Sequence, residues 1–396
     1  MTASAPPSTS GSGPTVYLHI GTPKSGTTYL QSRFSVNHEL AAQQGLLWPG
    51  PGWGRHIRAV QDLRNLEDGE PLAPEGSWAR LASEANRWTG RAVLISMEWM
   101  ASCTPHQVAV AVESLSPARV EVICTARDLV RSFVAQGQEM ARNYRPWSWG
   151  TLVDEVRNEK DGRAANTFWR QQNVPVILRR WLEVVPADRV HLVTVPPAGA
   201  DPGVLWERFC AVVGVDGSSF AAPRTDNASL GVVSTVLMQR LNNVARAQGV
   251  TPSVYSEVLH TSLGDRILGP RRKNEGPIGI TEDLDQYLRG RADAMVADLR
   301  DLGVDLVGEW DDLVPTKRPD GRRPEDVTDE ELLQLSLEAL VALGVSQSEE
   351  IHRLQAELKA ASHVIDASIP ARVRRKLRSL TARPPAEGPA AGTSVE

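Results

Sequence analysis

One stretch near the N-terminus, residues 15–30, constrains the fold more than any other part of the chain. It reads TVYLHIGTPKSGTTYL: an apolar run, a turn with two glycines, and the start of a helix. Since the first N–H groups of a helix lack partners and its dipole attracts negative charge, this order predicts an anion site at the edge of a buried sheet. Gly21 and Gly26 permit the tight path. The loop residues that we expect to contact the anion are Thr22, Pro23, Lys24, Ser25, Gly26, Thr27 and Thr28.

The loop differs from a Walker A motif. In that motif, GxxxxGK[ST], the lysine directly follows the second glycine and reaches the β- and γ-phosphates, and the next hydroxyl binds magnesium. Here Thr27 follows Gly26, and Lys24 precedes both. The groups that an ATP-using kinase needs are therefore displaced, which disfavours that class of enzyme.

Short apolar runs elsewhere predict the rest of a sheet. Including the first, the predicted buried strands are residues 16–20, 92–95, 120–125 and 190–195. Helix-like segments separate them, as in a parallel sheet with crossover helices. Helix starts are indicated at Thr104-Pro105 and Asp201-Pro202, where a capping residue precedes proline, and residues 292–303 read as a helix. The sequence predicts an α/β fold: a P-loop-like, three-layer fold with a central parallel sheet and a C-terminal helical extension.

Composition narrows the class of protein. The chain has 396 residues, 41% of them hydrophobic, enough for one large α/β domain with additions or for two small domains. A net charge of −5 argues against a protein that mainly coats nucleic acid. The three cysteines are far apart and form no CxxC pair, so we expect neither a disulfide framework nor a zinc site, and a reducing compartment fits.

The chain also lacks the usual marks of export and membrane insertion. Its first 14 residues have neither a basic start nor an apolar stretch, and no run approaches the roughly 18 apolar residues of a membrane span. We therefore predict a cytoplasmic protein.

Domain boundaries follow the composition. We expect residues 1–14 to be disordered, 15–315 to form the main domain, 316–327 a polar linker and 328–365 a helical extension, with a tail over 366–396. Thr328 and Glu331 form a capping box for a helix to about residue 343. A second helical pattern runs through Ile351, Leu354 and Leu358 towards Val364, too short by itself to establish a coiled coil.

The tail is basic, then rich in alanine and proline. Between residues 366 and 383 the basic residues are Arg372, Arg374, Arg375, Lys376, Arg378 and Arg383. This segment is interpreted first as a solvated charged tail; with apolar residues at helical spacing among the basic ones, a weak contact with an anionic membrane surface is the alternative.

The sequence PKSGTT, between a strand and a helix, resembles the loop of sulfotransferases that binds the 5′-phosphosulfate of 3′-phosphoadenosine 5′-phosphosulfate (PAPS). The resemblance implies transfer of a sulfonate group from PAPS, as co-substrate, to a hydroxyl acceptor such as a carbohydrate, lipid or natural product. Lys24 would neutralise the oxygen that leaves sulfur. A sulfonate carries less charge than a terminal phosphate, so we expect no metal.

A second site should hold the 3′-phosphate of the donor. In the family it follows a later strand and begins with an arginine; here Arg127 directly follows the predicted strand 120–125, and its guanidinium suits phosphate. An ion pair with Asp128 or another acid is the alternative role. Where the well-known cytosolic members carry a serine, this chain has Ala135, and Ser132 is the nearest substitute.

A late basic loop near the same phosphate is a further family feature. The sequence GPRRKNEG offers Arg271, Arg272 and Lys273, of which Arg272 is our candidate phosphate contact. A solvated loop is the alternative.

The acceptor hydroxyl must lose a proton, so a base is required. Glu98 follows the strand 92–95 at the expected edge of the sheet, where related enzymes carry a histidine or, in some cases, a glutamate. Apolar neighbours would raise the pKa of this carboxyl and make it a better base. His56 is a second candidate and His19 a third; burial in the core is the alternative for both.

Two other functions stay open: an ATP-using kinase of P-loop type, and a non-catalytic nucleotide-binding scaffold, which Ala135 favours. The sequence identifies neither the acceptor nor the oligomeric state.

Overall fold

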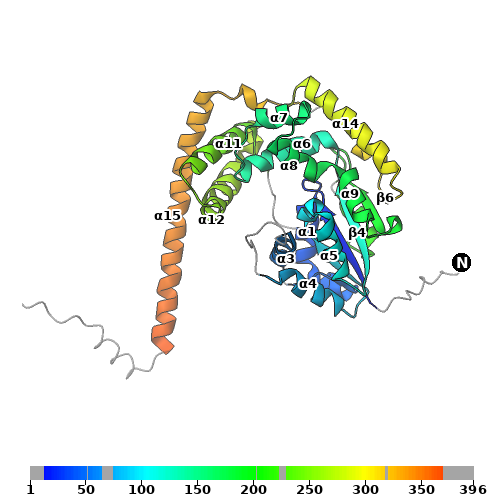
Figure 1. Ribbon diagram of the computed structural model, residues 1–396. Helices are drawn as coiled ribbons and strands as arrows, with labels where there is room; N and C mark the ends of the chain where they lie inside the picture. Colours follow the sequence, from blue (N-terminus) through cyan, green and yellow to red (C-terminus); the bar gives the residue numbers. More distant parts are fainter. Residues whose placement is uncertain are drawn as a thin grey trace, which may run out of the picture. The chain divides into compact units, whose positions relative to one another are not determined.

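The computed structural model describes residues 13–50, 52–64, 75–201, 203–222, 229–316 and 320–368. Its centre is one sheet with all strands parallel, in the order β2-β3-β1-β4-β5-β6 (Figure 1). The strands are β1 Thr15–Gly21, β2 Leu46–Leu47, β3 Ala92–Ser96, β4 Arg119–Ala126, β5 Val190–Thr194 and β6 Asp305–Val307. The predicted α/β fold with a central parallel sheet is therefore confirmed.

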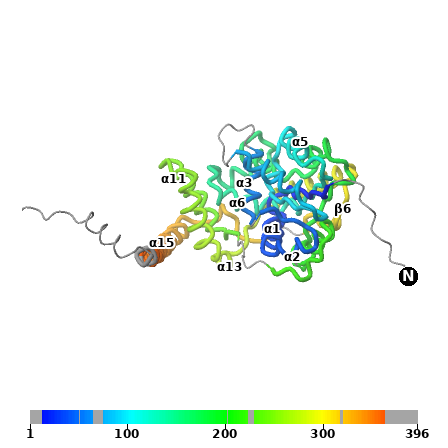
Figure 2. The backbone as a smooth tube through the Cα atoms, turned by 90° about the horizontal axis from the view of Figure 1, so that it is seen from below, coloured from blue at the N-terminus to red at the C-terminus, as the bar shows by residue number. Residues whose placement is uncertain are grey.

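Strand β1 shows why the sheet lies between two layers of helices. Val16, Leu18 and Ile20 pack into one core cluster and Tyr17 into another, because successive side chains of a strand point to opposite faces. Helices α3, α4, α5 and α9 contribute to the first cluster, and α1, α2 and α10 to the second (Figures 1 and 2). These helices are α1 Thr27–Val36, α2 His38–Gln43, α3 Gly54–Arg64, α4 Ser77–Asn86, α5 Pro105–Glu113, α9 Val174–Leu182 and α10 Gly203–Val213.

Further helices pack on one another around a third cluster, which includes Phe133, Phe168 and Leu288. This helical layer forms an arch next to the sheet layers in Figure 1. Its main helices are α6 Leu129–Arg142, α7 Trp149–Arg157, α8 Arg163–Gln172, α11 Val232–Ala247 and α14 Glu282–Arg300. The smaller helical elements of the chain are η1 Glu98–Ser102, η2 Ala187–Arg189, α12 Pro252–Val254, η3 Tyr255–Leu268, η4 Gly269–Arg271, α13 Arg272–Glu275, η5 Trp310–Leu313 and η6 Pro324–Asp326.

Two of the predicted helix starts have the expected caps. The Thr104 side chain accepts a hydrogen bond from the N–H of Gln107, whose side chain accepts one from the N–H of Thr104. At Asp201, a carboxylate oxygen accepts from the N–H of Gly203, where α10 begins. The helix predicted over 292–303 is the second half of the longer α14.

The C-terminal helices differ from the prediction. Thr328 and Glu331 form the expected capping box, but one helix, α15 (Asp329–Ser368), replaces the two predicted helical segments. The intervening residues 344–350 contain no proline, and a single glycine costs a helix only about 1 kcal/mol relative to alanine.

The chain divides into two compact units, Met1–Ser336 and Leu337–Glu396. The sheet and the helical layer belong to the first; the described part of the second is the remainder of α15. Across the described ranges, no helix is both long and apolar enough to cross a membrane. Most of the segment 366–383, with its proposed membrane contact, lies outside the described residues, as do residues 1–12.

The sheet packing gives a first prediction. Leu18 on β1 is 0% exposed in the centre of the sheet. We expect Leu18→Ala to lower the free energy of unfolding by about 2–5 kcal/mol, because it removes buried methyl groups and leaves a cavity. Urea unfolding followed by circular dichroism measures this. Val36→Ala, at a side chain 59% exposed, is the control; an equal effect of both substitutions would contradict the assignment of Leu18 to the core.

Candidate functional site

The candidate site lies where the connections of the sheet reverse direction. After β1 the chain leads to β2 on one side, and after β4 it leads to β5 on the other, although β1 and β4 are neighbours. Open α/β sheets bind ligands outside the carboxyl ends of the strands at such a switch point. The loop 22–26 follows β1, Arg127 follows β4, and Glu98 comes two residues after β3, so the sheet brings the main candidates to one edge.

Hydrogen bonds to β4 and α8 hold the loop. The N–H of Thr22 donates to the carbonyl oxygen of Thr125 at 2.8 Å, and the Ser25 hydroxyl lies 2.5 Å from the Thr125 hydroxyl. On the other side, the amide of Gln172 donates to the carbonyl oxygen of Pro23 at 2.9 Å. Thr22 and Ser25 are buried, so their hydrogen bonds to Thr125 fix the path of the loop.

Gly26 forms the turn into α1. Its φ is 84°, and a Cβ atom there would come within 2.4 Å of the Leu205 side chain. No side chain caps α1 at this position. The first N–H groups of a helix have no partner within it, so those of α1, beginning at Thr27, can bind an anion.

Lys24 lies at the apex of the loop and pairs with a carboxylate on another element. Its φ of 66° is unusual for a residue with a side chain. Its ammonium lies 2.6 Å from a carboxylate oxygen of Glu139 on α6. Burial would raise the pKa of Glu139, but Lys24, Arg142 and Asn143 outweigh burial and hold that pKa at about 2. The lysine therefore faces a carboxylate that stays ionised.

Glu139 is the site residue that the sequence analysis missed. It lies near the C-terminal end of α6. Only the packing of α6 over the loop 22–26 brings this particular carboxylate to Lys24.

Glu98 approaches the same loop from β3. A Cβ atom on Gly21 would lie 2.9 Å from the backbone oxygen of Glu98, so the two backbones are in close contact. The Gln31 side chain donates to a Glu98 carboxylate oxygen at 2.8 Å. Burial raises the pKa of Glu98, partly opposed by this hydrogen bond and by the charge of Lys24, and Glu139 raises it further.

Both candidate histidines are buried within the protein framework. His56 on α3 accepts a hydrogen bond from the N–H of Ser96 on one ring nitrogen, and the other lies 3.0 Å from the carbonyl oxygen of Pro49. Burial lowers its pKa to about 4. His19 contacts the hydroxyls of Ser96 and Thr125 at 2.7 and 3.1 Å, and burial lowers its pKa to about 3. These contacts leave neither ring a free nitrogen.

Arg127 lies against the loop. Its Nη1 donates to the carbonyl oxygen of Lys24 at 3.3 Å, and its Nε is buried without a hydrogen-bond partner among the described residues. Burial lowers its pKa to about 10, and the charge of Arg131 adds to this. Of the alternative ion pairs with Asp128 or another acid, none is found for Arg127 among the described residues, and the Asp128 carboxylate caps α6 and pairs with Arg131.

The two other candidates for the 3′-phosphate lie near Arg127. Ser132 is buried in the first turn of α6, and its hydroxyl donates to the carbonyl oxygen of Arg127 at 3.5 Å. Arg272 is exposed on α13, close enough that its charge also lowers the pKa of Arg127. Ser132 and Arg272 therefore both lie near Arg127. Arg272 is brought there by the fold, because it is far from Arg127 in sequence.

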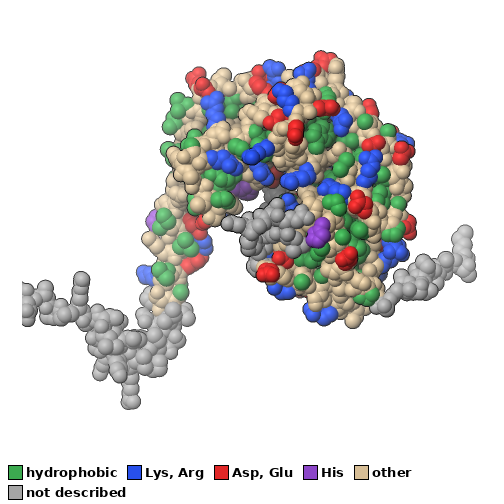
Figure 3. All heavy atoms as spheres, in the orientation of Figure 1, with side chains coloured by type: hydrophobic (Ala, Val, Ile, Leu, Met, Phe, Trp, Pro, Cys, Tyr) green, Lys and Arg blue, Asp and Glu red, His purple; other side chains and the backbone are tan. Residues whose placement is uncertain are grey.

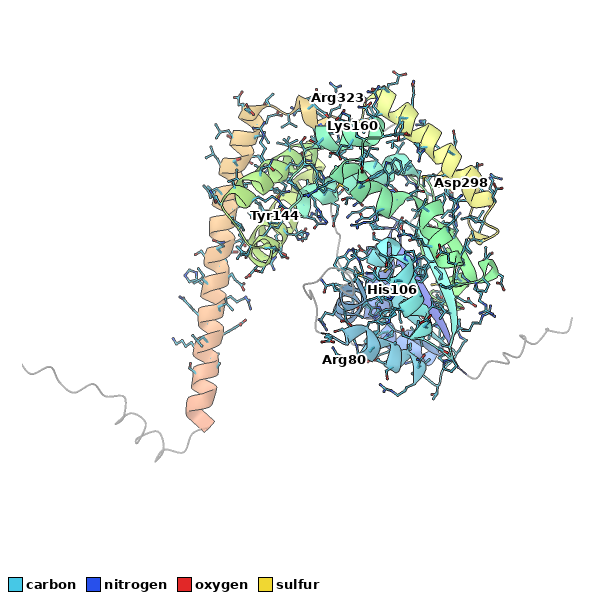
Figure 4. The ribbon with its side chains drawn as sticks, in the orientation of Figure 1. Arg80, His106, Tyr144, Lys160, Asp298 and Arg323 are labelled. Atoms are coloured by element: carbon cyan, nitrogen blue, oxygen red, sulfur yellow. The ribbon has the colours of Figure 1, made fainter. Side chains whose placement is uncertain are left out.

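Four arginines of the protein lie close enough to affect one another's charge. Burial lowers the pKa of Arg145, and the charges of Arg170, Arg246 and Arg64 lower it further. Arg246 also donates to the carbonyl oxygen of Tyr144, which Figure 4 labels in the helical layer. Figure 3 shows Lys and Arg side chains gathered around a hollowed part of this face. Such a concentration of positive charge attracts anions.

Comparison with known proteins adds little. No family model and no curated protein matches the chain. Among solved structures it is similar to a sulfotransferase from Alicyclobacillus acidocaldarius, with 14% identity and a TM-score of 0.36; the match covers 61% of this chain and 98% of that one. Such a likeness is too remote to carry a functional assignment, so function has to be argued from the site.

The Lys24–Glu139 pair predicts a pH dependence of stability. The pKa of Glu139 in the folded protein, about 2, lies below its ordinary value of 4.5. A carboxyl whose pKa is lower in the folded protein stabilises the fold at pH values above its pKa in the unfolded chain. This stabilisation is lost as the pH falls from about 4.5 towards 2. Glu139→Gln should therefore lose less stability than the parent protein between pH 5 and pH 3, measured as the change in urea midpoint. Glu113→Gln, at an exposed glutamate on α5, should behave like the parent. Parallel curves for Glu139→Gln and the parent would contradict the ion pair.

Proposed function

We propose that the protein is a sulfotransferase that moves the sulfonate group of PAPS to a hydroxyl acceptor. The observation that carries the proposal is the convergence of three groups at the switch point of the sheet: Lys24 in the loop after β1, Arg127 after β4 and Glu98 after β3. A cation for the leaving oxygen, a guanidinium for a phosphate and a partly desolvated carboxylate for the acceptor proton are what this transfer requires.

The donor would be held at its two phosphate ends. The N–H groups at the start of α1 and the hydroxyls of Thr27 and Thr28 would bind the 5′-phosphosulfate. Arg127 would bind the 3′-phosphate through its unpartnered Nε, with the charge of Arg272 and the hydroxyl of Ser132 nearby. A donor with phosphate at both ends of the nucleoside suits this arrangement better than a triphosphate chain, since the cations are divided between two strand ends.

The transfer itself would be a single in-line displacement. The acceptor oxygen attacks sulfur, and the bond between sulfur and the bridging oxygen breaks. The electron pair of that bond stays on the 5′-phosphate, where Lys24 neutralises the charge. The acceptor proton passes to Glu98, whose raised pKa makes it a stronger base than an exposed carboxylate. The products are a sulfate ester and 3′-phosphoadenosine 5′-phosphate.

In this mechanism Glu139 is a positioning residue. Without donor it holds the ammonium of Lys24 at 2.6 Å and keeps the long side chain extended across the loop. The incoming phosphosulfate would share the same ammonium. The carboxylate thus prepares the position of Lys24 before the donor arrives, which lowers the cost of ordering the lysine in the transition state.

Substitution of the two cations tests donor binding and transfer separately. Arg127→Ala should weaken binding of 3′-phosphoadenosine 5′-phosphate about ten- to a hundredfold in calorimetry, because a charge-assisted hydrogen bond is lost. Lys24→Ala should abolish transfer of labelled sulfonate from PAPS to a panel of sugar, lipid and phenolic acceptors. Arg179→Ala, at an arginine paired with Asp298 on the outer face of α9, is the matched control. Undiminished transfer by Lys24→Ala would overturn its role.

The same two assays separate the proposal from its rivals. A kinase predicts that ATP with magnesium raises the melting temperature more than 3′-phosphoadenosine 5′-phosphate does. A non-catalytic scaffold predicts that the nucleotide binds but that no acceptor of the panel is sulfonated. Either result would contradict a sulfotransferase.

The base assignment predicts a pH profile. Glu98→Gln should lower kcat by about 10²–10⁴-fold, the usual contribution of a general base. In the parent protein kcat/KM should rise with pH through the raised pKa of Glu98, because only the carboxylate accepts the proton. The hydrogen bond from Gln31 lowers this pKa, so Gln31→Ala should move the acidic limb of the profile to higher pH. If the acidic limb of the Gln31→Ala profile lay at the same pH as that of the parent, Glu98 would not be the base.

A further inference from the structure

The second unit of the chain carries apolar residues at heptad spacing along α15, interrupted at Gly344 and Gln347. From Leu337 onward, residues spaced alternately three and four apart fall on one face, as the a and d positions of a heptad repeat do. These residues are Leu337, Leu340, Gly344, Gln347, Ile351, Leu354, Leu358 and Ala361. A seven-residue repeat of this kind is typical of a helix that coils around another helix, because a single packed helix follows a period closer to 3.6.

The large side chains of this face are open to solvent. Leu337 is 53% exposed, Leu340 67%, Ile351 54%, Leu354 49% and Leu358 70%. Over the whole stretch from residue 347 to 362, every side chain is exposed. Such a row of exposed leucines is unusual for a monomeric protein and indicates a surface that another molecule covers.

The helix also has little to stabilise it alone. In this stretch Arg353 pairs with Glu350 and Glu357, and exposed pairs of this type contribute only a few tenths of a kcal/mol each. Most helical stability in proteins comes from packing of an apolar face. The face defined above, residues 337–361, is available for that purpose on the described part of the second unit.

The identity of the polar positions favours a second copy of the same chain as the partner. Gln347 occupies a d position, and an amide both donates and accepts, so two facing copies can satisfy each other. Glu350 and Glu357 occupy the flanking g positions. In a parallel pair they lie beside Gln355 and Ser362 of the second copy, so no like charges oppose each other.

The size of the face is also sufficient. A helix of 25 residues is about 37 Å long. At roughly 100 Å² for each large side chain, a value implied by their transfer free energies, the five exposed leucine and isoleucine side chains of both copies bury on the order of 1,000 Å². This is about the size at which an interface becomes specific.

We propose that residues 337–361 of α15 pair with the same segment of a second copy in a two-stranded coiled coil, which makes the protein a homodimer. Ile351 at an a position followed by Leu354 at a d position favours two strands over three. The proposal is independent of the proposed enzymatic activity, because none of the site residues described above lies in this segment.

Light scattering coupled to size-exclusion chromatography tests this on the full chain at tens of micromolar. The parent protein should have the mass of two chains, and L354E/L358E the mass of one, because two glutamates per copy would face each other in the apolar seam. The matched control is A356E/A360E, which adds the same charges to the same turns at outward f and c positions and should keep the mass of two chains.

The melting temperature of the first unit should be unchanged in both double variants, which excludes general misfolding as the cause. A parent protein with the mass of one chain would overturn the proposal. So would an L354E/L358E variant that stays dimeric, since the contact would then lie elsewhere in the chain.

Discussion

Much of the site depends on the way Thr125, near the end of β4, ties the phosphate-type loop to the sheet. Its carbonyl oxygen accepts from the N–H and the hydroxyl of Thr22, and its hydroxyl donates to the carbonyl oxygen of Gly21 and contacts Ser25 and His19. All these groups are buried, where an unmade hydrogen bond is costly, so they act together. Because Arg127 comes two residues after Thr125, the network that shapes the loop also sets the distance between the two candidate phosphate contacts.

The two carboxylates near Lys24 have pKa values that are shifted in opposite directions. Both are affected by burial, yet the pKa of Glu139 is lowered and that of Glu98 is raised. The reason is the position of the ammonium, which touches Glu139 directly and reaches Glu98 only as a more distant charge. Environments that separate the pKa values of two nearby acids are a recurring feature of acid–base sites. In the proposed mechanism, this difference would leave one carboxylate to order the lysine and the other to accept a proton.

The sequence was sufficient for the parts of the fold that local chemistry determines. Four strands are mostly apolar runs, and the caps at Thr104 and Thr328 need only neighbouring residues. It was insufficient for β2 and β6, which have two and three residues and are too short to show a pattern. In the site, the motif predicted Lys24 and the strand ends predicted Arg127 and Glu98. Glu139 and Gln31 could not be predicted, because their roles arise from how α6 and α1 pack against the loop.

The ion pair of Lys24 has a consequence for selectivity. A ligand that approaches the loop must share the ammonium with a carboxylate that remains ionised, so part of its attraction to Lys24 is offset by repulsion from Glu139. A weakly charged ligand gains little binding free energy from Lys24 under these conditions. A ligand that also binds the N–H groups of α1 and the guanidinium of Arg127 gains enough binding free energy from several charge-assisted hydrogen bonds to compete with Glu139 for the ammonium. If the proposed activity holds, the pair therefore favours a donor with anionic groups at two separate points over inorganic phosphate or sulfate, which can occupy only one of them.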